Sequence, residues 1–343
     1  MDETIDINNT LPFEGGNSSP SIIKVIGVGG GGGNAVIHMY KTGIEDVTFV
    51  LCNTDEQALK NSDIPRKLQL GDGLGAGGDP IKGRDEAKKS IDEITELFND
   101  GTQMTFITAG MGGGTGTGAA PIVAKVAKDL GILTVGIVTI PFIFEGQKKI
   151  QQAWAGVEEM RKNVDSLLVI NNERLREIYP NLNFLNAFAK ADDTLTIAAK
   201  SIAEIITIKG RINLDFADVK NTLKNGGVSI MSSGYGKGEK RVTKAIEDAL
   251  NSPLLNDDNV FDAKRVLFNL YFSPEEQDQV KMEEMNEVNE FMSKFNDDVE
   301  VIWGAAFDNS LKDTMKITIL ATGFGSSELP GLSLIHISEP TRL

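Results

Sequence analysis

Two glycine-rich segments constrain the fold of this chain more than any other feature of its sequence. Each follows an apolar run typical of a strand and precedes a helical stretch: Gly27–Asn34 and Gly110–Gly118. Glycine lets a backbone approach phosphate oxygens closely, and a helix N-terminus supplies unpaired N–H donors and the positive end of a dipole. The pattern predicts a parallel sheet that holds a nucleotide's phosphates at the ends of two strands.

The first glycine segment alone also fits a dinucleotide fingerprint, because Asp55 follows the second apolar run, where a ribose-binding acid would lie. That interpretation predicts a nicotinamide-dependent oxidoreductase, but such an enzyme has no use for a second glycine segment. The chain also has only two histidines, His38 and His336, as candidate acid–base groups. The phosphate-binding sequence GxxxxGKS/T does not occur. A third glycine-rich segment, Gly71–Pro80, either closes over the phosphates or forms an ordinary surface loop.

Apolar runs alternate with helical stretches from Ser21 onward, which is typical of a parallel sheet covered by helices on both faces. In the first half we expect strands at Ile22–Val28, Val47–Asn53, Gln103–Ala109, Ile132–Thr139 and Ser166–Ile170. We expect helices there at Asn34–Lys41, Ile81–Asn99, Thr117–Asp129 and Gln147–Asn163. A long helix follows over about Asn183–Ile208, because its apolar residues recur every three or four positions.

The second half predicts a smaller α/β unit, joined to the first by the long helix. Its expected strands are Val228–Ser232, Val266–Phe272, Val299–Phe307 and Met315–Thr322, of which the last two could pair as a hairpin. Its expected helices are Glu239–Leu250 and Pro274–Phe295, after a short stretch at Asp215–Lys224.

The length of 343 residues is enough for about two domains. We expect a disordered segment at 1–20, a nucleotide-binding domain at 21–182, the central helix with the next loop and helix at 183–224, a C-terminal domain at 225–326 and a tail at 327–343. Within that tail, residues 332–342 (LSLIHISEPTR) resemble a translated sequencing adapter, so the natural tail is expected to differ.

Charge and composition exclude several classes of function. The chain has 34 Lys and Arg against 49 Asp and Glu, a net charge of −15, which disfavours nucleic-acid binding and direct contact with anionic membranes. The one cysteine, Cys52, lies in an apolar run and is expected to be buried. We find no signal-peptide pattern and no uncharged apolar stretch of roughly 20 residues, so we expect a cytoplasmic protein without membrane insertion.

The glycine segments together resemble the FtsZ family of tubulin-like cell-division GTPases. The similarity rests on GGGTGTG at Gly112–Gly118, GVGGGGGNAV at Gly27–Val36 and GLGAG at Gly73–Gly77. It continues in the family order from about residue 21 to residue 325, through Asn53–Asp55, Phe144–Gly146, Asn213–Asp218 and Ala321–Gly323. The resemblance implies a Rossmann-like GTPase domain and a smaller C-terminal α/β domain, joined by a long central helix.

The resemblance implies GTP as the nucleotide and assigns its contacts to matching positions of this chain. Glu145 and Asn172 would contact the ribose and its neighbouring groups, Phe188 would stack on guanine, and Asp192 would accept from guanine N1–H and N2. From the residues alone, core packing is the simpler interpretation of Phe188. The remaining nucleotide contacts would be Gly29, Gly30, Gly31, Gly32, Gly33, Asn34, Asn53, Asp55, Gly77, Gly112, Gly113, Gly114, Thr115, Gly116, Thr117, Gly118 and Lys149.

Two positions depart from the family pattern. Lys149 stands where arginine is usual, which replaces a bidentate contact by a point charge. Asp79 stands where asparagine is usual, which adds a negative charge near the expected γ-phosphate.

Asn213, Asp215 and Asp218 have two interpretations. From the residues alone, Asp215 and Asp218 approximate a capping box at a helix start. The resemblance instead implies that the three residues meet the γ-phosphate of the next subunit and polarise the attacking water. It also implies Mg²⁺ held through the GTP phosphates and water, with no direct protein ligands.

A site shared between subunits has a consequence for assembly. Nucleotide at one end and catalytic acids at the other form a heterologous contact, which propagates into an open filament. The resemblance implies assembly with GTP and disassembly after hydrolysis to GDP, in a ring at mid-cell, with membrane tethers and regulators bound through the C-terminal tail. The alternative is a tubulin-like nucleotide-binding regulator that never polymerises, which would have no need of the three catalytic residues.

Overall fold

The computed structural model describes residues 21–208, 210–252, 260–275 and 278–324. The predictions for 1–20 and 327–343 lie outside this part of the chain. The strands that it does describe form one sheet in the order β3-β2-β1-β4-β5-β6-β8-β11-β9-β10-β7. The strands are β1 (Ile23–Val28), β2 (Val47–Asn53), β3 (Arg66–Gln69), β4 (Met104–Gly110), β5 (Leu133–Ile140), β6 (Ser166–Asn171), β7 (Gly210–Ile212), β8 (Gly227–Lys237), β9 (Arg265–Phe272), β10 (Glu300–Phe307) and β11 (Thr314–Thr322).

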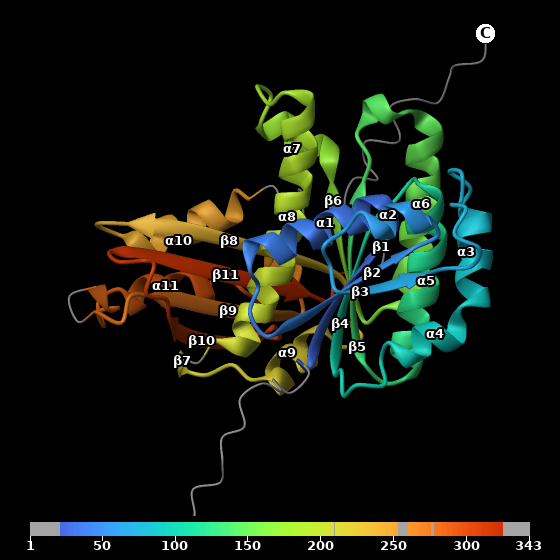
Figure 1. Ribbon diagram of the computed structural model, residues 1–343. Coiled ribbons are helices and arrows are strands. Elements are labelled where there is room, and N and C mark those ends of the chain that lie inside the picture. Colours follow the sequence, from blue (N-terminus) through green and yellow to red (C-terminus); the bar gives the residue numbers. More distant parts are fainter. Residues whose placement is uncertain (1–20, 209, 253–259, 276–277, 325–343) are drawn as a thin grey trace, which may run out of the picture.

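Helices alternate with the strands through most of the fold (Figure 1). The α-helices are α1 (Gly29–Thr42), α2 (Glu56–Lys60), α3 (Pro80–Lys89), α4 (Ile91–Glu96), α5 (Gly114–Asp129), α6 (Gln147–Asn163), α7 (Asn172–Ile178), α8 (Phe184–Thr207), α9 (Phe216–Leu223), α10 (Arg241–Leu250) and α11 (Met285–Met292). Two 3-10 helices are η1 (Ile143–Glu145) and η2 (Val260–Asp262).

The first half is a parallel sheet from β3 to β6, covered on both faces as predicted. Strand β1 shows the principle: Val25 belongs to the core shared with α1 and α8, and Ile26 to the core shared with α5 and α6. Such double burial explains why these strands are almost continuously apolar in sequence. Cys52 is buried as expected, and burial raises the pKa of its thiol to about 12.

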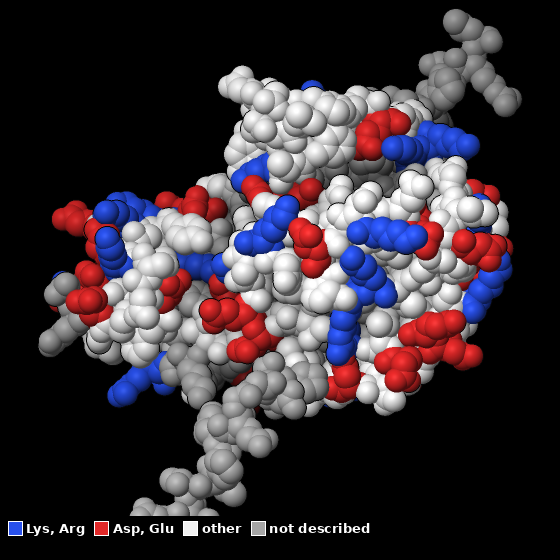
Figure 2. Space-filling view, viewed as in Figure 1, with Lys and Arg blue, Asp and Glu red and all other residues white. Residues whose placement is uncertain are grey.

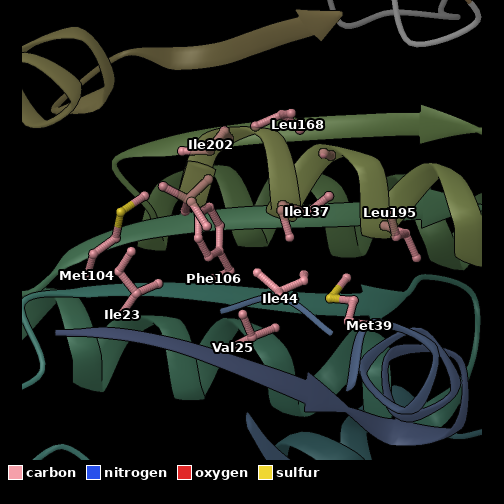
Figure 3. Packing of buried hydrophobic residues seen from close by; sticks show 14 of the residues in the cluster. Ile23, Val25, Met39, Ile44, Met104, Phe106, Ile137, Leu168, Leu195 and Ile202 are labelled. Carbon is pink, nitrogen blue, oxygen red and sulfur yellow. The ribbon is translucent and has the colours of Figure 1, made fainter. Parts of the chain in front are cut away.

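Helix α8 is the long predicted helix, and its apolar face packs on this sheet. Leu195 and Ile202 of α8 face Phe106 and Ile137 of the strands (Figure 3). The helix has 24 residues and is therefore about 36 Å long at 1.5 Å per residue. Figure 1 shows α7 beside its first end and α9 beside its last, so anything carried at the two ends is far apart.

In the second half, β11 lies between β8 and β9 and is antiparallel to both, and β10 is parallel to β9. The predicted hairpin of β10 with β11 is therefore wrong. Burial agrees with the observed order, because every residue of β11 after the first is buried while much of β10 is not. The two halves also share one sheet, since Ser166–Leu168 of β6 pairs with Gly227–Ser229 of β8.

Several helix boundaries differ from the predictions. Helices α1 and α5 begin at Gly29 and Gly114, so both glycine segments contribute the first helical turns. The predicted helix Ile81–Asn99 is divided at Ser90, whose hydroxyl accepts a hydrogen bond from Gly71 N at 3.1 Å. Of the predicted helix Pro274–Phe295 only α11 is helical among the residues described there. Strands β3 and β7 and helices α2 and α7 were not predicted.

Surface charge and helix hydropathy agree with the composition. On the face shown in Figure 2, acidic and basic side chains are interspersed, so the net charge of −15 forms no single-sign patch on that face. Among the helices that the structure describes, none has the length and apolar character needed to cross a membrane.

Candidate nucleotide-binding site

A cavity of about 280 Å³ lies where β4, β5 and β6 end and α1 begins. Carboxyl ends of parallel strands are the usual ligand site of an open α/β sheet. Predicted contact residues that line it are Gly31, Asn34, Gly112, Gly113, Glu145, Lys149, Asn172, Phe188 and Asp192. Its other lining residues, which sequence reasoning did not identify as contacts, are Gly110, Met111, Thr139, Pro141, Ala191 and Leu195. Thr139 and Pro141 could have been identified from the sequence, because they lie at the end of a predicted strand next to the strand that carries a glycine segment.

A larger cavity, of about 550 Å³, lies along α8 on the side of the C-terminal strands. Its lining includes Lys200, Glu204, Tyr235 and Lys316 but no residue of either glycine segment. Size therefore does not identify the phosphate site, and the smaller cavity carries the predicted chemistry.

Most glycines of the two segments are required by the fold itself. A Cβ atom on Gly32 would lie 2.2 Å from the Thr108 carbonyl oxygen, and one on Gly116 would lie 2.5 Å from that of Gly110. A Cβ atom on Gly118 would lie 2.0 Å from the Pro80 carbonyl oxygen, because α3 packs closely on α5. A Cβ atom on Gly114 would lie 2.8 Å from the backbone nitrogen of Asp79. Gly29 has a φ of +73°, a backbone conformation that favours glycine.

Gly30 and Gly113 are different. A Cβ atom at either position would meet no atom of the described chain within 4 Å, and neither residue has a positive φ. The fold would therefore accept a side chain at both positions. A backbone kept bare beside a cavity, at the start of a helix, is the arrangement that a bound phosphate group requires.

The threonines of the second segment shape it from within. The Thr117 hydroxyl accepts a hydrogen bond from Gly112 N at 2.8 Å, where the backbone has a φ of +99°. The Thr115 hydroxyl lies 2.6 Å from that of Thr54, which ties the segment to the end of β2. Both hydroxyls thus have protein partners that fix the glycine turn.

Asn53, Asp55 and Gly77 do not line the cavity. The Asn53 side chain accepts a hydrogen bond from Asp55 N at 3.2 Å. The Asp55 side chain caps α2 by accepting hydrogen bonds from backbone N–H groups in the first turn of that helix. Gly77 is exposed on the third glycine segment. That segment lies against the end of β2, since Gly75 N donates to the Thr54 carbonyl at 2.8 Å, and Asp79 caps α3. A Cβ atom on Gly33 would lie 3.8 Å from the Leu51 side chain, which is an ordinary van der Waals contact.

The far end of the cavity suits a flat base. Phe188 is half-buried, so it is not a pure core residue, and its ring lies 5.2 Å from the ring of Phe142. Asn172 is buried, and its Oδ1 has no hydrogen-bond partner among the described residues. An orphaned buried acceptor is costly unless a ligand donates to it, so this atom fits a nucleoside.

Asp192 is the acid at this end of the cavity. The pKa of its carboxyl is raised to about 6, mainly by burial. The neighbouring Asp193 also raises this pKa, and His38 lowers it in part. An ionised carboxylate in such a place gains from two donors on one edge of a base, which guanine offers through N1–H and N2.

Glu145 and Lys149 form the rim. The Glu145 carboxylate accepts from Phe142 N at 3.0 Å and pairs with Lys149 Nζ at 3.3 Å. The Lys149 side chain is exposed, so this pair contributes little stability and leaves the ammonium group able to meet a phosphate.

Asn213, Asp215 and Asp218 lie at the other end of α8, beside α9 (Figure 1). Asp215 accepts from Ala217 N at 2.8 Å and Asp218 N at 3.0 Å, and Asp218 accepts from Asp215 N at 2.9 Å. The capping box predicted from the residues is therefore present. Within one chain the structure does not bring these residues to the cavity. Asp192, which lines the cavity, is already about 22 Å along α8 from Thr207, where this helix ends.

Comparison with known proteins identifies the family. The model of the Tubulin/FtsZ family GTPase domain matches residues 22–180, and that of the FtsZ family C-terminal domain matches residues 227–325. The cell division protein FtsZ of Porphyromonas gingivalis is 56% identical over 328 residues, covering 94% of this chain and 70% of the relative. That of Azotobacter vinelandii is 46% identical over 312 residues, covering 89% and 78%.

Solved structures agree. The empty FtsZ dimer of M. jannaschii superposes with a TM-score of 0.79 at 40% identity, covering 88% of each chain. The GTPγS-bound protofilament of CetZ2 from Haloferax volcanii gives a TM-score of 0.75 at 19% identity, covering 89% and 94%, which shows the fold alone. The chain therefore belongs to the tubulin/FtsZ family, as a polymerising GTPase of the FtsZ cell-division type.

Proposed function

We propose that each hydrolytic site of this GTPase is completed by the acidic loop of the next subunit. One observation carries the proposal: the nucleotide cavity and the residues Asn213, Asp215 and Asp218 lie at opposite ends of α8. A single chain cannot bring them together without unfolding. Two chains stacked head to tail can, because the loop end of one then meets the cavity end of the other.

Different residues of the cavity bind the phosphates, the base and the sugar of the nucleotide. The N–H groups at the starts of α1 and α5, around Gly30 and Gly113, hold the phosphates. Asp192 accepts from guanine N1–H and N2, and Phe188 stacks on the base. Asn172 and Glu145 contact the sugar and adjoining groups, and the Lys149 ammonium meets a phosphate.

Mg²⁺ enters this scheme through the nucleotide. Among the described residues, no group of three or more His, Cys, Asp or Glu side chains is arranged to hold a metal ion. Mg²⁺ readily keeps several waters and binds substrate phosphates, so GTP itself supplies its ligands. When bound, the ion neutralises charge that develops on the phosphates.

Asp215 and Asp218 then act on a water molecule. Phosphoryl transfer needs mainly positioning and charge neutralisation, so carboxylates that orient the attacking water are sufficient. The capping box holds both carboxylates toward the start of α9. Loss of the γ-phosphate removes contacts from the shared interface, which weakens the filament.

Assembly at the mid-cell division site, with tethers and regulators bound through a C-terminal tail, completes the proposal. It rests on membership of the FtsZ family. The domain bounds 21–182, 183–224 and 225–326 belong to the same proposal.

The test is the GTPase rate per subunit across a range of protein concentrations, with Asp215→Ala alongside. A shared site predicts a rate near zero in dilute solution and a rise above a threshold, with Asp215→Ala binding GTP but not turning it over. A rate per subunit independent of concentration would show a self-contained hydrolase. A non-polymerising regulator would fail to sediment with a slowly hydrolysed GTP analogue.

A further inference from the structure

Helix α9 carries the proposed catalytic acids at its first turn, and its last turn is held by the C-terminal strands. The Arg265 guanidinium at the start of β9 donates to the carbonyl oxygens of Asn221 and, at 3.1 Å, Lys224. The Thr322 hydroxyl at the end of β11 donates to the Thr222 carbonyl at 2.9 Å and is buried.

These contacts satisfy groups that a helix cannot satisfy itself. The last four carbonyls of any helix lack partners within the helix, and a cation beside them also interacts well with the helix dipole. Here Arg265 and Thr322 together donate hydrogen bonds to three carbonyl oxygens at the C-terminal end of α9. Arg265 and Thr322 are also direct register partners on β9 and β11, so they form one rigid support.

The support matters because α9 is short. A helix of eight residues has little stability of its own, so its direction is set by what it touches. Its buried residues Val219, Thr222 and Leu223 fix one side of it. The carbonyl contacts fix its end and tie it to the C-terminal half of the sheet.

We propose that Arg265 and Thr322 are positioning residues for hydrolysis, which rests on the proposed function above. They hold the far end of α9 so that Asp215 and Asp218 reach the next subunit's nucleotide at a fixed angle. Their hydrogen bonds go to the carbonyls of Asn221, Thr222 and Lys224 at the far end of α9, and not to the carboxylates of Asp215 and Asp218 at its start. The carbonyl contacts therefore tie the acids to the C-terminal strands, in addition to the core that Val219 and Leu223 share with α8 and the first-half strands.

The test separates turnover from nucleotide binding. Arg265→Met keeps an apolar stem of similar length but removes the donors, and Thr322→Val removes only a hydroxyl. Displacing reacting groups by about 1 Å can cost a hundredfold in rate, so we expect kcat for GTP to fall by about tenfold to a hundredfold in assembled protein. The GTP dissociation constant should stay within about twofold, because the cavity is at the other end of α8. Arg265→Lys should recover part of kcat.

A mixing experiment excludes a simple folding defect. Arg265→Met has an intact cavity, and Asp192→Ala has an intact α9, so co-assembly creates interfaces with both parts intact. We expect the mixture to hydrolyse GTP faster than the sum of its components. Lys294→Met, which removes an exposed cation from the same half of the chain, is the matched control and should not change kcat.

The outcomes distinguish the two proposals. If Arg265→Met and Thr322→Val keep full kcat while Asp215→Ala abolishes it, the positioning role is wrong and the shared site stands. The positioning role is also wrong if the mixture gives no gain, or if GTP affinity falls in parallel with kcat. If Asp215→Ala keeps full turnover, the shared site itself is wrong. If Arg265→Met does not fold, Thr322→Val and Arg265→Lys decide the matter by the same criteria.

Discussion

A methyl group on Gly113 would meet nothing of the described chain within 4 Å, whereas one on Gly116 would lie 2.5 Å from the Gly110 carbonyl oxygen. The two glycines are three positions apart in one motif, yet only Gly116 is required for packing. At Gly113 the space belongs to the cavity. We therefore propose that a bound ligand, and not packing, accounts for glycine at that position.

We expect Gly113→Ala to weaken GDP and GTP binding by at least about tenfold, since a methyl group would occupy phosphate space. Its melting temperature should change little, because replacing an N-cap glycine costs only about 1 kcal/mol at most. Gly116→Ala is the contrast and should lower the melting temperature clearly. Titration with a fluorescent GDP analogue and thermal unfolding measure the two effects. Unchanged affinity in Gly113→Ala would contradict the phosphate assignment.

We expect Asp192 to make nucleotide binding depend on pH. Burial raises the pKa of its carboxyl to about 6 from 3.8. Below pH 6 the carboxyl holds a proton and cannot accept from both guanine donors, so we expect affinity to fall by about tenfold per pH unit below that point. Asp192→Asn should bind weakly at every pH and remove this dependence. A wild-type affinity that is constant from pH 7.5 to pH 5 would refute the role of Asp192.

The same shift has a consequence for the nucleotide-free protein. The folded state keeps the Asp192 proton up to about pH 6, and the unfolded chain loses it near pH 4. The folded state therefore binds more protons in that window. The contribution of Asp192 to stability falls as the pH rises from about 4 to about 6, the reverse of its effect on binding.

At the scale of elements, the opposite edge of the parallel sheet is held by a buried charge. Lys24 of β1 is fully buried and pairs with Asp100 at 2.9 Å, and Asp100 also pairs with Arg66 of β3 at 2.7 Å. Burial lowers the pKa of Lys24 despite this partner, so its charge is tolerated only while Asp100 is ionised. Burial alone would raise the pKa of Asp100, but hydrogen bonds from Thr102, Lys24 and Arg66 lower it to about 2.

We expect Asp100→Asn to lower the free energy of unfolding by about 3–5 kcal/mol, because it leaves the Lys24 ammonium buried without a counter-ion. Since the folded pKa of Asp100 is below its unfolded value, the stability it gives is present above about pH 4 and lost as the pH falls to about 2. Urea unfolding measures both effects. Arg66→Met, at a half-exposed position, should cost less than about 1 kcal/mol. An equal loss in the two variants would show that burial of Lys24 is not the cause.

At the scale of the whole molecule, the two ends of α8 give one subunit two different interaction surfaces. We expect Asp215→Ala filaments formed with GTP to persist long after wild-type filaments have depolymerised, because the γ-phosphate remains in the interface. Sedimentation over time measures their lifetime. Asp297→Ala, which removes another exposed acid, should depolymerise like the wild type. Equal lifetimes for Asp215→Ala and wild type would contradict the shared site.

The features that could be predicted from the amino-acid sequence are local ones. Nearly continuous apolar runs predicted β1, β2 and β4 to within a residue, since a strand buried on both faces is apolar at most positions. The glycine segments likewise indicated the place of the cavity and its lining residues Gly31, Asn34, Gly112 and Gly113, because a helix that follows a strand directly must start at the sheet's carboxyl edge. The resemblance supplied the other five predicted lining residues, Glu145, Lys149, Asn172, Phe188 and Asp192. Family resemblance supplied the guanine, which no periodicity reveals.

The remaining features depend on contacts between residues that are far apart in the chain. The position of β11 between β8 and β9, the break at Ser90 and the short α11 follow from partners far along the chain, so no local pattern encodes them. Gly113 and Gly116 are the same residue type in one motif, and only the surrounding atoms separate a ligand contact from a packing contact. The separation of Asp215 from the cavity likewise depends on how α8 spans the sheet, because the helix from Asp192 to Thr207 converts sequence separation into about 22 Å of distance.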